Sequence, residues 1–424
     1  MRTRRIRTWI LGFAPVLTVS AQEPPKPAPA QGKPRTKDII GLPENYIRFS
    51  RVGGGGIQPL VFPGADGTLR VLYFVARGDE RGDLFTCVSK DEGKTFSEPR
   101  RLNATEGSVA APRSFHRAAG ALAAEGLLHV LWLDSSGSAD DEGRACRLAY
   151  TRVGAGGDVE PERDLFPAHD EVALTALAVD PEQQNVFAFF AAPETLAEGA
   201  TRTRIWGARS TDAGASFSEP VTIDPEGDGV CVDSAISAGV SPKGALYALY
   251  RMFASYGKPE NPAAGVMDSR LLTSVDDGQS FKAGFVDNWK FGRDPQSGAC
   301  LFRGPHHMFM AFEGRGQVYW SYIKDDSHKI GLPIAPKRKW EELWRTRAVV
   351  AANDGKEVIL VYLERPRAGT NLPRPAEDAV PVVAWQVWDK SRNFPIEHGV
   401  APDAPGKSSP AVFVRADGGF TIVY

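Results

Sequence analysis

One octapeptide pattern recurs three times along the chain and constrains its fold more than any other feature. The pattern, S-x-D-x-G-x-[ST]-F, occupies residues 89–96, 210–217 and 274–281. Short Ser and Asp side chains hydrogen-bond backbone groups in tight turns, and Gly adopts the positive φ that such turns require. The closing Phe is suited to fill the space between neighbouring sheets. We therefore expect three equivalent hairpin turns in an array of repeated sheets.

The spacing of the three turns predicts a further, degenerate copy. Their first residues are 89, 210 and 274, so the steps are 210 − 89 = 121 and 274 − 210 = 64 residues. One more unit fits inside the longer gap, where residues 148–152 precede a Gly-rich turn. Each outer hairpin follows a pair of apolar segments around a turn, as at residues 60–62 and 69–75. The repeated unit is thus an inner strand pair followed by an outer hairpin.

The octapeptide resembles the Asp-box of sialidase-like β-propellers, and three good copies make the resemblance specific. It implies an all-β fold of four-stranded blades around a central channel. Outer hairpins indicate six blades, while residues 411–424 supply one more inner pair. Two alternatives stay open: residues 46–52 complete a seventh blade with that pair, or the pair is an addition to six blades. In both, pairing of the chain ends closes the ring and removes exposed sheet edges.

The N-terminus has the pattern of an export signal. Four arginines within residues 2–7 precede a short apolar run at 9–19, and Val19-Ser20-Ala21 fits a small-residue cleavage site. The run is too short to span a bilayer, so we expect no stable membrane insertion. We predict a signal peptide at 1–21 cut after Ala21, a Pro-rich linker at 22–42 and one propeller domain at 43–424. The mature protein is then periplasmic or secreted.

Composition argues against several classes of function. Removing the four signal arginines leaves 50 − 4 = 46 basic residues against 52 acidic ones, a net charge of −6. No basic cluster is present, which argues against nucleic-acid binding. Histidines and cysteines lack metal-ligand spacing, so we expect no metal and no cofactor. Four cysteines are expected to be buried thiols: Cys87, Cys146, Cys231 and Cys300. We also expect the protein to be a monomer.

The resemblance can be followed through the arginines that sialidases use to hold a substrate carboxylate. A planar guanidinium suits this task because it pairs a carboxylate with two parallel hydrogen bonds. Gln58 stands where the first arginine is expected, in Gly56-Ile57-Gln58-Pro59. Arg251 matches the second arginine, after an inner hairpin. Arg315, ten residues before Asp325, matches the third.

The proton-transfer groups match the family less well. Asp83 stands in the loop where the acid is expected, and Asp233 would replace the usual Glu with a shorter side chain. The nucleophilic tyrosine is absent, because counting back from Asp354-Gly355 reaches residues 345–347, which are Arg-Thr-Arg. Glu364 belongs to a segment that resembles the family's Tyr-Glu-Arg ending. Sialic acid hydrolysis through a tyrosine nucleophile is therefore not expected.

Two hypotheses follow for the function. In the first, the protein is a glycoside hydrolase or lyase acting on an acidic glycan, with four carboxylates as candidates for proton transfer. In the second, it is a non-catalytic propeller that binds a glycan, another anionic ligand or a protein. The candidate catalytic residues are Asp83, Asp233, Glu313 and Glu364. The candidate substrate-binding residues are Gln58, Arg251, Arg303, Arg315, Arg345 and Arg347.

Overall fold

The described part of the chain contains 27 β-strands and no helix. The computed structural model describes residues 42, 45–64, 66–78, 81–110, 118–136, 146–167, 171–197, 199, 201–224, 229–232, 234–255, 266–290, 298–314, 316–324, 327, 329–336, 342–354, 356–367, 379–391, 393–402 and 409–424. The predicted signal peptide and all of the predicted linker except Leu42 lie outside these residues. In the described segments, no helix is long and apolar enough to cross a membrane. The predicted all-β class is confirmed.

Four-stranded antiparallel units follow one another along the chain, and we number them as blades. Blade 1 contains β2 (Ile57–Pro63), β3 (Leu69–Ala76), β4 (Arg81–Ser89) and β5 (Arg100–Arg101). Blade 2, the unit predicted inside the long gap, contains β7 (Ala118–Leu122), β8 (Leu128–Asp134), β9 (Arg147–Val153) and β10 (Arg163–Asp164). The short strand β6 (Val109–Ala110) pairs with β4 and β8 and joins these two blades into one sheet.

Blades 3 to 6 repeat the same plan. Blade 3 contains β11 (Leu174–Val179), β12 (Val186–Thr195), β13 (Thr201–Ser210) and β14 (Val221–Thr222). Blade 4 contains β15 (Ser237–Val240), β16 (Leu246–Ser255), β17 (Val266–Ser274) and β18 (Lys282–Lys290). Blade 5 contains β19 (Ala299–Arg303), β20 (Met308–Gly314) and β21 (Gln317–Ile323), with two isolated bridges beyond β21 in place of a fourth strand. Blade 6 contains β22 (Leu343–Ala352), β23 (Glu357–Pro366), β24 (Val382–Asp389) and β25 (Phe394–Val400).

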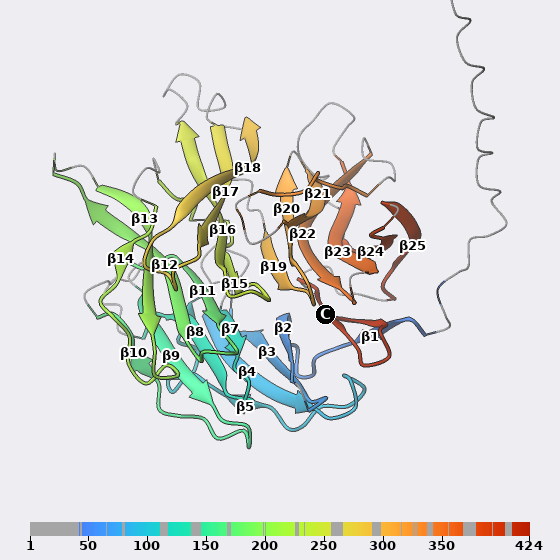
Figure 1. Cartoon of the computed structure of the whole chain (residues 1–424). Helices are drawn as coiled ribbons and strands as arrows, with labels where there is room; N and C mark the ends of the chain where they lie inside the picture. The colour runs from blue at the N-terminus through green and yellow to red at the C-terminus, as the bar shows by residue number, and fades with distance from the viewer. Residues whose placement is uncertain are drawn as a thin grey trace, which may run out of the picture. The chain divides into compact units, whose positions relative to one another are not determined.

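A three-stranded terminal sheet lies between blade 6 and blade 1. It contains β26 (Ala411–Val414), β27 (Phe420–Val423) and the N-terminal strand β1 (Ile47–Ser50), in the order β1-β27-β26. Strand β26 contacts both β22 and β2, so the inner strands of the six blades and the terminal sheet form a closed ring. Figure 1 shows the inner strands gathered towards the middle of the view and the outer strands at its edge. The chain is thus a β-propeller.

Ring closure depends on pairing between the two ends of the described chain. Strand β1 pairs in parallel with β27, with Ile47 opposite Phe420 and Ser50 opposite Val423. In Figure 1 the C-terminus lies beside β1. The N-terminal segment therefore belongs to the three-stranded terminal sheet, and the predicted pairing of the chain ends is present.

A buried arginine holds this closure together. Arg415 is 4% exposed, and its guanidinium donates to the main-chain oxygens of Asn45 (2.9 Å), Tyr46 (3.3 Å) and Phe420. It also bonds Asp417 at 3.2 Å. One side chain thus satisfies carbonyl groups from both chain ends, where unpaired buried carbonyls would be costly.

Replacing this arginine is expected to open the ring. We predict that Arg415→Met lowers the free energy of unfolding by about 3 kcal/mol, because the main-chain oxygens of Asn45, Tyr46 and Phe420 each lose a hydrogen bond. Arg48→Met is the matched control, since Arg48 pairs with Glu92 at 3.1 Å but is about one-third exposed; it should cost less than about 1 kcal/mol. Urea unfolding followed by tryptophan fluorescence measures both. Equal losses would contradict the proposed role of Arg415.

The three octapeptide turns share one hydrogen-bond pattern. In the first turn, the Ser89 hydroxyl donates to Asp91 at 2.7 Å and accepts from the Gly93 amide at 2.8 Å, while Thr95 donates to Asp91 through both its amide and its hydroxyl. The turns at 210–217 and 274–281 repeat every one of these bonds. These bonds lower the pKa of the Asp91 carboxyl to about 2. The turn residues are therefore structural.

Each turn also packs against the preceding sheet. Phe217 of blade 3 lies edge-on to Tyr150 and Phe166 of blade 2, at centroid distances of 5.4 and 6.4 Å. Gly214, at φ +76°, lies so close that a β-carbon there would be 2.0 Å from the Tyr150 hydroxyl. The turn phenylalanine thus fills the space between two sheets, as predicted. Glycine is required at position 214 both because φ is positive and because a side chain would collide with Tyr150.

This contact encloses a histidine. His129 on β8 is 0% exposed, and its Nδ1 lies 2.6 Å from the Tyr150 hydroxyl. Burial, together with the charge of Arg152, lowers the pKa of His129 to about 4. The imidazole is therefore neutral near pH 7.

Stability should fall on acidification because of this histidine. The folded-state pKa lies below the unfolded value of about 6.5, so the unfolded chain takes up the proton first as pH falls from about 6.5 towards 4. We predict that the wild type loses about 2 kcal/mol more than His129→Gln between pH 7 and pH 5. Urea unfolding midpoints measured across this range test the prediction. Parallel pH profiles for the two proteins would contradict it.

Candidate functional site

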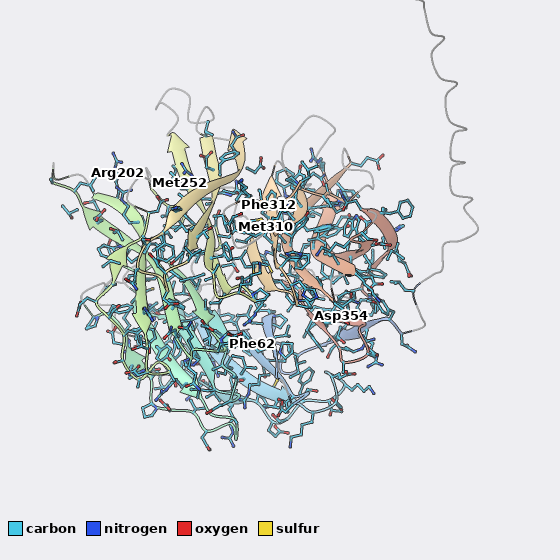
Figure 2. The ribbon with its side chains drawn as sticks, viewed as in Figure 1. Phe62, Arg202, Met252, Met310, Phe312 and Asp354 are labelled. Atoms are coloured by element: carbon cyan, nitrogen blue, oxygen red, sulfur yellow. The ribbon has the colours of Figure 1, made fainter. Side chains whose placement is uncertain are left out.

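Polar and charged side chains gather at the end of the channel where the inner strands begin. We call this the entry end. In Figure 2, Met252 and Phe312, the neighbours of Arg251 and Glu313, lie towards the top of the view, whereas Asp354, which follows β22, lies lower. Because strands within a blade are antiparallel, the start of each first strand, the end of the second and the start of the third meet at this end.

A buried carboxyl group, Glu313, occupies the end of β20. It is 1% exposed, and its Oε1 accepts the main-chain N–H groups of Gly298, at 2.7 Å, and Arg347. Burial raises the pKa of Glu313 to about 7, against the opposing effects of these two hydrogen bonds and of the Arg251 and Arg347 charges. A carboxyl with a pKa near 7 is suited to give or take a proton at neutral pH.

Arg251 reaches Glu313 from the neighbouring blade. It lies near the end of β16, is 4% exposed, and its Nη2 donates to the main-chain oxygen of Glu313 at 2.6 Å. Nearby on β17, burial raises the pKa of Asp268, and the charges of Arg270 and Arg251 oppose that effect. The ends of blades 4 and 5 thus place a cation beside the candidate proton-transfer group.

A β-bulge in β22 aims Arg347 at the same carboxyl. The pairing register of β22 with β23 shifts between Thr346 and Val349, and Arg347 has φ +55°. Its main-chain N–H points to Glu313, and its Nη1 donates to the Ser409 hydroxyl at 3.1 Å. A left-handed conformation at a non-glycine residue stores local strain that the surrounding structure must hold in place.

Arg345, by contrast, is enclosed by protein groups. Its side chain is 0% exposed, donates to Glu364 at 2.8 Å and to Gln317 at 2.8 Å, and lies over the ring of Tyr362. We expected Arg345 to bind substrate, but its guanidinium is engaged by Glu364 and Gln317. Its position instead indicates that it clamps blades 5 and 6 together and holds Glu364.

Asp83 has a similar structural setting. Its side chain is 0% exposed; Oδ1 accepts from Asn103 at 2.8 Å and from the Gly107 amide at 2.7 Å, and Oδ2 pairs with Arg77. Burial alone would raise the pKa of Asp83, but these bonds outweigh it and the pKa is lowered. A carboxylate kept ionised by these partners does not suit the predicted role of proton donor.

The remaining predicted site residues are dispersed. Gln58, with φ +55°, lies at the start of β2 and lines the channel. Arg303 ends β19 and lines a hollow of about 460 Å³ with Asp354, at the opposite end from Glu313, so the structure separates it from the other arginines. Asp233 and Arg315 lie outside the described residues. The structure therefore brings together Arg251, Glu313, Arg345, Arg347 and Glu364.

Several residues that hold the site residues in place belong to no sequence motif. Gln317 and Ser409 have ordinary polar side chains, and Gly298 contributes only its amide. These contacts join segments more than ten residues apart, so no local spacing could reveal them. In the part of the chain that the structure describes, no group of three or more His, Cys, Asp and Glu residues is arranged to hold a metal ion.

No family model matches the chain, and no curated protein matches it. Among solved structures, a Hadza microbial sialidase is similar, at 12% identity and a TM-score of 0.45, covering 80% of this chain and 67% of that one. An α-L-arabinanase of Penicillium chrysogenum is similar at 12% identity and a TM-score of 0.49, covering 80% and 95%. An ulvan lyase, described as a new family of polysaccharide lyase, is similar at 10% identity and a TM-score of 0.41, covering 72% of this chain and 75% of that one.

The Arg345 clamp should be a large contributor to stability. We predict that Arg345→Met lowers the free energy of unfolding by about 3 kcal/mol or more, because Glu364, only 13% exposed, is left as a buried charge without its partner. The double variant Arg345→Met/Glu364→Gln should recover part of this loss, since the unpaired charge is gone. Chemical unfolding of the two single variants and the double variant measures the coupling. Strictly additive losses would contradict the clamp.

Proposed function

We propose that this protein is an exported, carbohydrate-active propeller that acts on an acidic glycan at the entry end of its channel. The observation that carries the proposal is the Glu313 carboxyl, whose pKa is raised to about 7 by burial and which lies beside Arg251 and Arg347. Export is inferred from the N-terminal sequence. The proposed substrate-binding groups are Arg251, Arg347 and, from sequence, Arg315.

The proposed chemistry divides the work between charge and proton transfer. Arginine guanidinium groups attract and orient a carboxylate of the glycan, which brings the scissile bond to the entry end. Glu313 then gives a proton to, or takes one from, the reacting sugar, as a hydrolase or a lyase requires. Asp233 is retained from the sequence as a second candidate. Asp83 and Arg345 are left out of this chemistry because each is held in an ion pair, Asp83 with Arg77 and Arg345 with Glu364.

One observation favours a second function, a propeller that binds an acidic glycan without turning it over. The position where the resemblance places a nucleophilic tyrosine falls within residues 345–347, and Arg345 is held there in a buried ion pair. The sequence has no tyrosine among residues 345–347. Hydrolysis through a covalent tyrosine intermediate is therefore not proposed under either function.

The proposal predicts a loss of turnover when the Glu313 carboxyl is replaced by a group that cannot transfer a proton. On a panel of fluorogenic glycosides and uronate-containing polysaccharides, Glu313→Gln should lower turnover about 10²- to 10⁴-fold. The wild-type rate should also change around pH 7, falling above it if Glu313 is the acid and below it if Glu313 is the base. Glu98→Gln, an exposed change two residues after the first octapeptide turn, is the control and should leave the rate unchanged.

Measurements of turnover and of glycan binding in the same variants distinguish the enzyme from the binding propeller. Turnover that is lost in Arg251→Ala and Glu313→Gln but kept in Glu98→Gln would support the enzyme. Binding on a glycan array that Arg251→Ala abolishes, with no turnover of any substrate, would support the binding propeller. Robust release of sialic acid by the wild type would contradict the assignment of residues 345–347 to the nucleophile position.

A further inference from the structure

A second carboxyl group lies beside the end of β20, on the side of blade 4. It belongs to Asp287 on β18, whose side chain is partly exposed. A β-carbon added at Gly314 would overlap Asp287 Oδ2 and lie 3.5 Å from its Cγ, so this carboxylate rests against the residue that follows Glu313. Gly314 does not have a positive φ. Glycine at this position therefore serves to make room for the carboxylate.

A β-bulge turns Asp287 towards blade 5. The pairing register of β17 with β18 shifts after Ser269, which lies opposite Asp287, while Arg270 lies opposite Phe285. Val286 is the extra residue of the bulge. A regular ladder would place Val286 opposite Ser269 and turn Asp287 to the other face of the sheet. Bulges next to active sites re-aim a side chain in this way.

The bulge also places Asp287 in one row with Arg251. Ser269 pairs with Arg251 on one side and with Asp287 on the other, so the three side chains project from the same face of blade 4. Both ends of this row meet the end of β20. Arg251 donates to the main-chain oxygen of Glu313 at 2.6 Å, and Asp287 rests against Gly314. A proposed substrate-binding cation and a carboxylate thus contact neighbouring residues at the entry end.

The carboxyl groups of Glu313 and Asp287 flank β20 from opposite sides. Along this strand Ala311 packs with residues of blade 6 and Phe312 with residues of blade 4, and successive side chains continue the alternation. Glu313 accordingly meets the Arg347 amide of blade 6, whereas the next position faces Asp287 of blade 4. The main chain of β20 stands between the two groups, which keeps them farther apart than the about 5 to 5.5 Å of a retaining pair. A wider pair leaves room for a water molecule.

We propose that Asp287 is the catalytic base of an inverting hydrolysis in which Glu313 is the acid, a role that rests on the proposed function. Glu313 gives its proton to the glycosidic oxygen as the bond between that oxygen and the anomeric carbon breaks. Asp287 takes a proton from a water molecule, whose oxygen bonds to the anomeric carbon from the opposite side. Glu313 is left as a carboxylate and Asp287 protonated, and exchange of one proton with solvent restores both. No covalent intermediate forms, so no tyrosine is needed among residues 345–347.

The first product of the wild type tests the stereochemistry. The glycoside of the panel that the full chain turns over would be followed by proton NMR from the start of the reaction, before the released anomers interconvert. We expect the anomer opposite to that of the substrate. Asp287→Asn should lower kcat about 10²- to 10⁴-fold with little change in KM, because the water loses its base while the glycan keeps its contacts.

Added azide distinguishes a catalytic base from a structural carboxylate. In Asp287→Ala, azide should restore turnover, because this anion attacks the anomeric carbon without giving up a proton, and the product should be a glycosyl azide of inverted configuration. A purely structural loss would not respond to azide. Gly314→Ala keeps both carboxyl groups in the chain but pushes Asp287 aside, so it should lower kcat about 10²-fold and replaces the Asp287 variants if they fail to fold.

Asp277→Asn is the matched control, the same kind of change in the same blade but at the octapeptide turn, where Asp277 pairs with Arg209 at 3.5 Å. Its turnover should equal that of the wild type. A product of retained configuration, an unsaturated lyase product, or equal rates in Asp287→Asn and Asp277→Asn would overturn the role of Asp287. Loss of turnover in Glu313→Gln would then still support the proposed function, whereas no turnover by the wild type would overturn both.

Discussion

The pairing of β1 with β27 is the interaction on which the rest of the structure depends. It joins the two ends of the described chain, and without it the terminal sheet would lack its outer strand. Arg415 supplies donors to carbonyls from both ends, while Ser50 and Arg48 of β1 reach the first octapeptide turn, at Gly93 and Glu92. The closure therefore links the terminal sheet to blade 1. A closed ring fixes the positions of all the inner strands, and with them the channel and the entry end.

Blade geometry explains why the candidate site residues lie together at the entry end of the channel. Antiparallel pairing brings the beginnings of the inner strands and the ends of the second strands to one end of the channel, so Arg251, Glu313 and Arg347 meet although 96 residues separate the first from the last. The β22 bulge then turns one main-chain amide towards Glu313. Regular strand geometry would direct that amide into the ladder with β23, so the irregularity, rather than the repeat, shapes the site.

Two buried carboxyl groups show how partners decide protonation. Asp83 receives side-chain donors from Arg77 and Asn103 as well as the Gly107 amide, and its pKa is lowered. Glu313 receives two amides and no side-chain hydrogen bond among the described residues, so burial dominates and its pKa rises. Hydrogen bonds and the Arg77 charge thus keep Asp83 an ionised structural anchor, whereas burial makes Glu313 a titratable group.

The sequence by itself determined the repeat, the all-β class and the pairing of the chain ends, because turn chemistry and apolar alternation are local properties. It also identified Glu313, Arg251, Arg347 and Glu364 as candidates. Only the tertiary structure decided that Arg345 and Asp83 are buried in ion pairs and that Arg303 lies at the other end of the channel. Burial and partner choice depend on residues from different blades, such as Gln317 for Arg345 and Gly298 for Glu313. Those neighbours come together only when the ring closes.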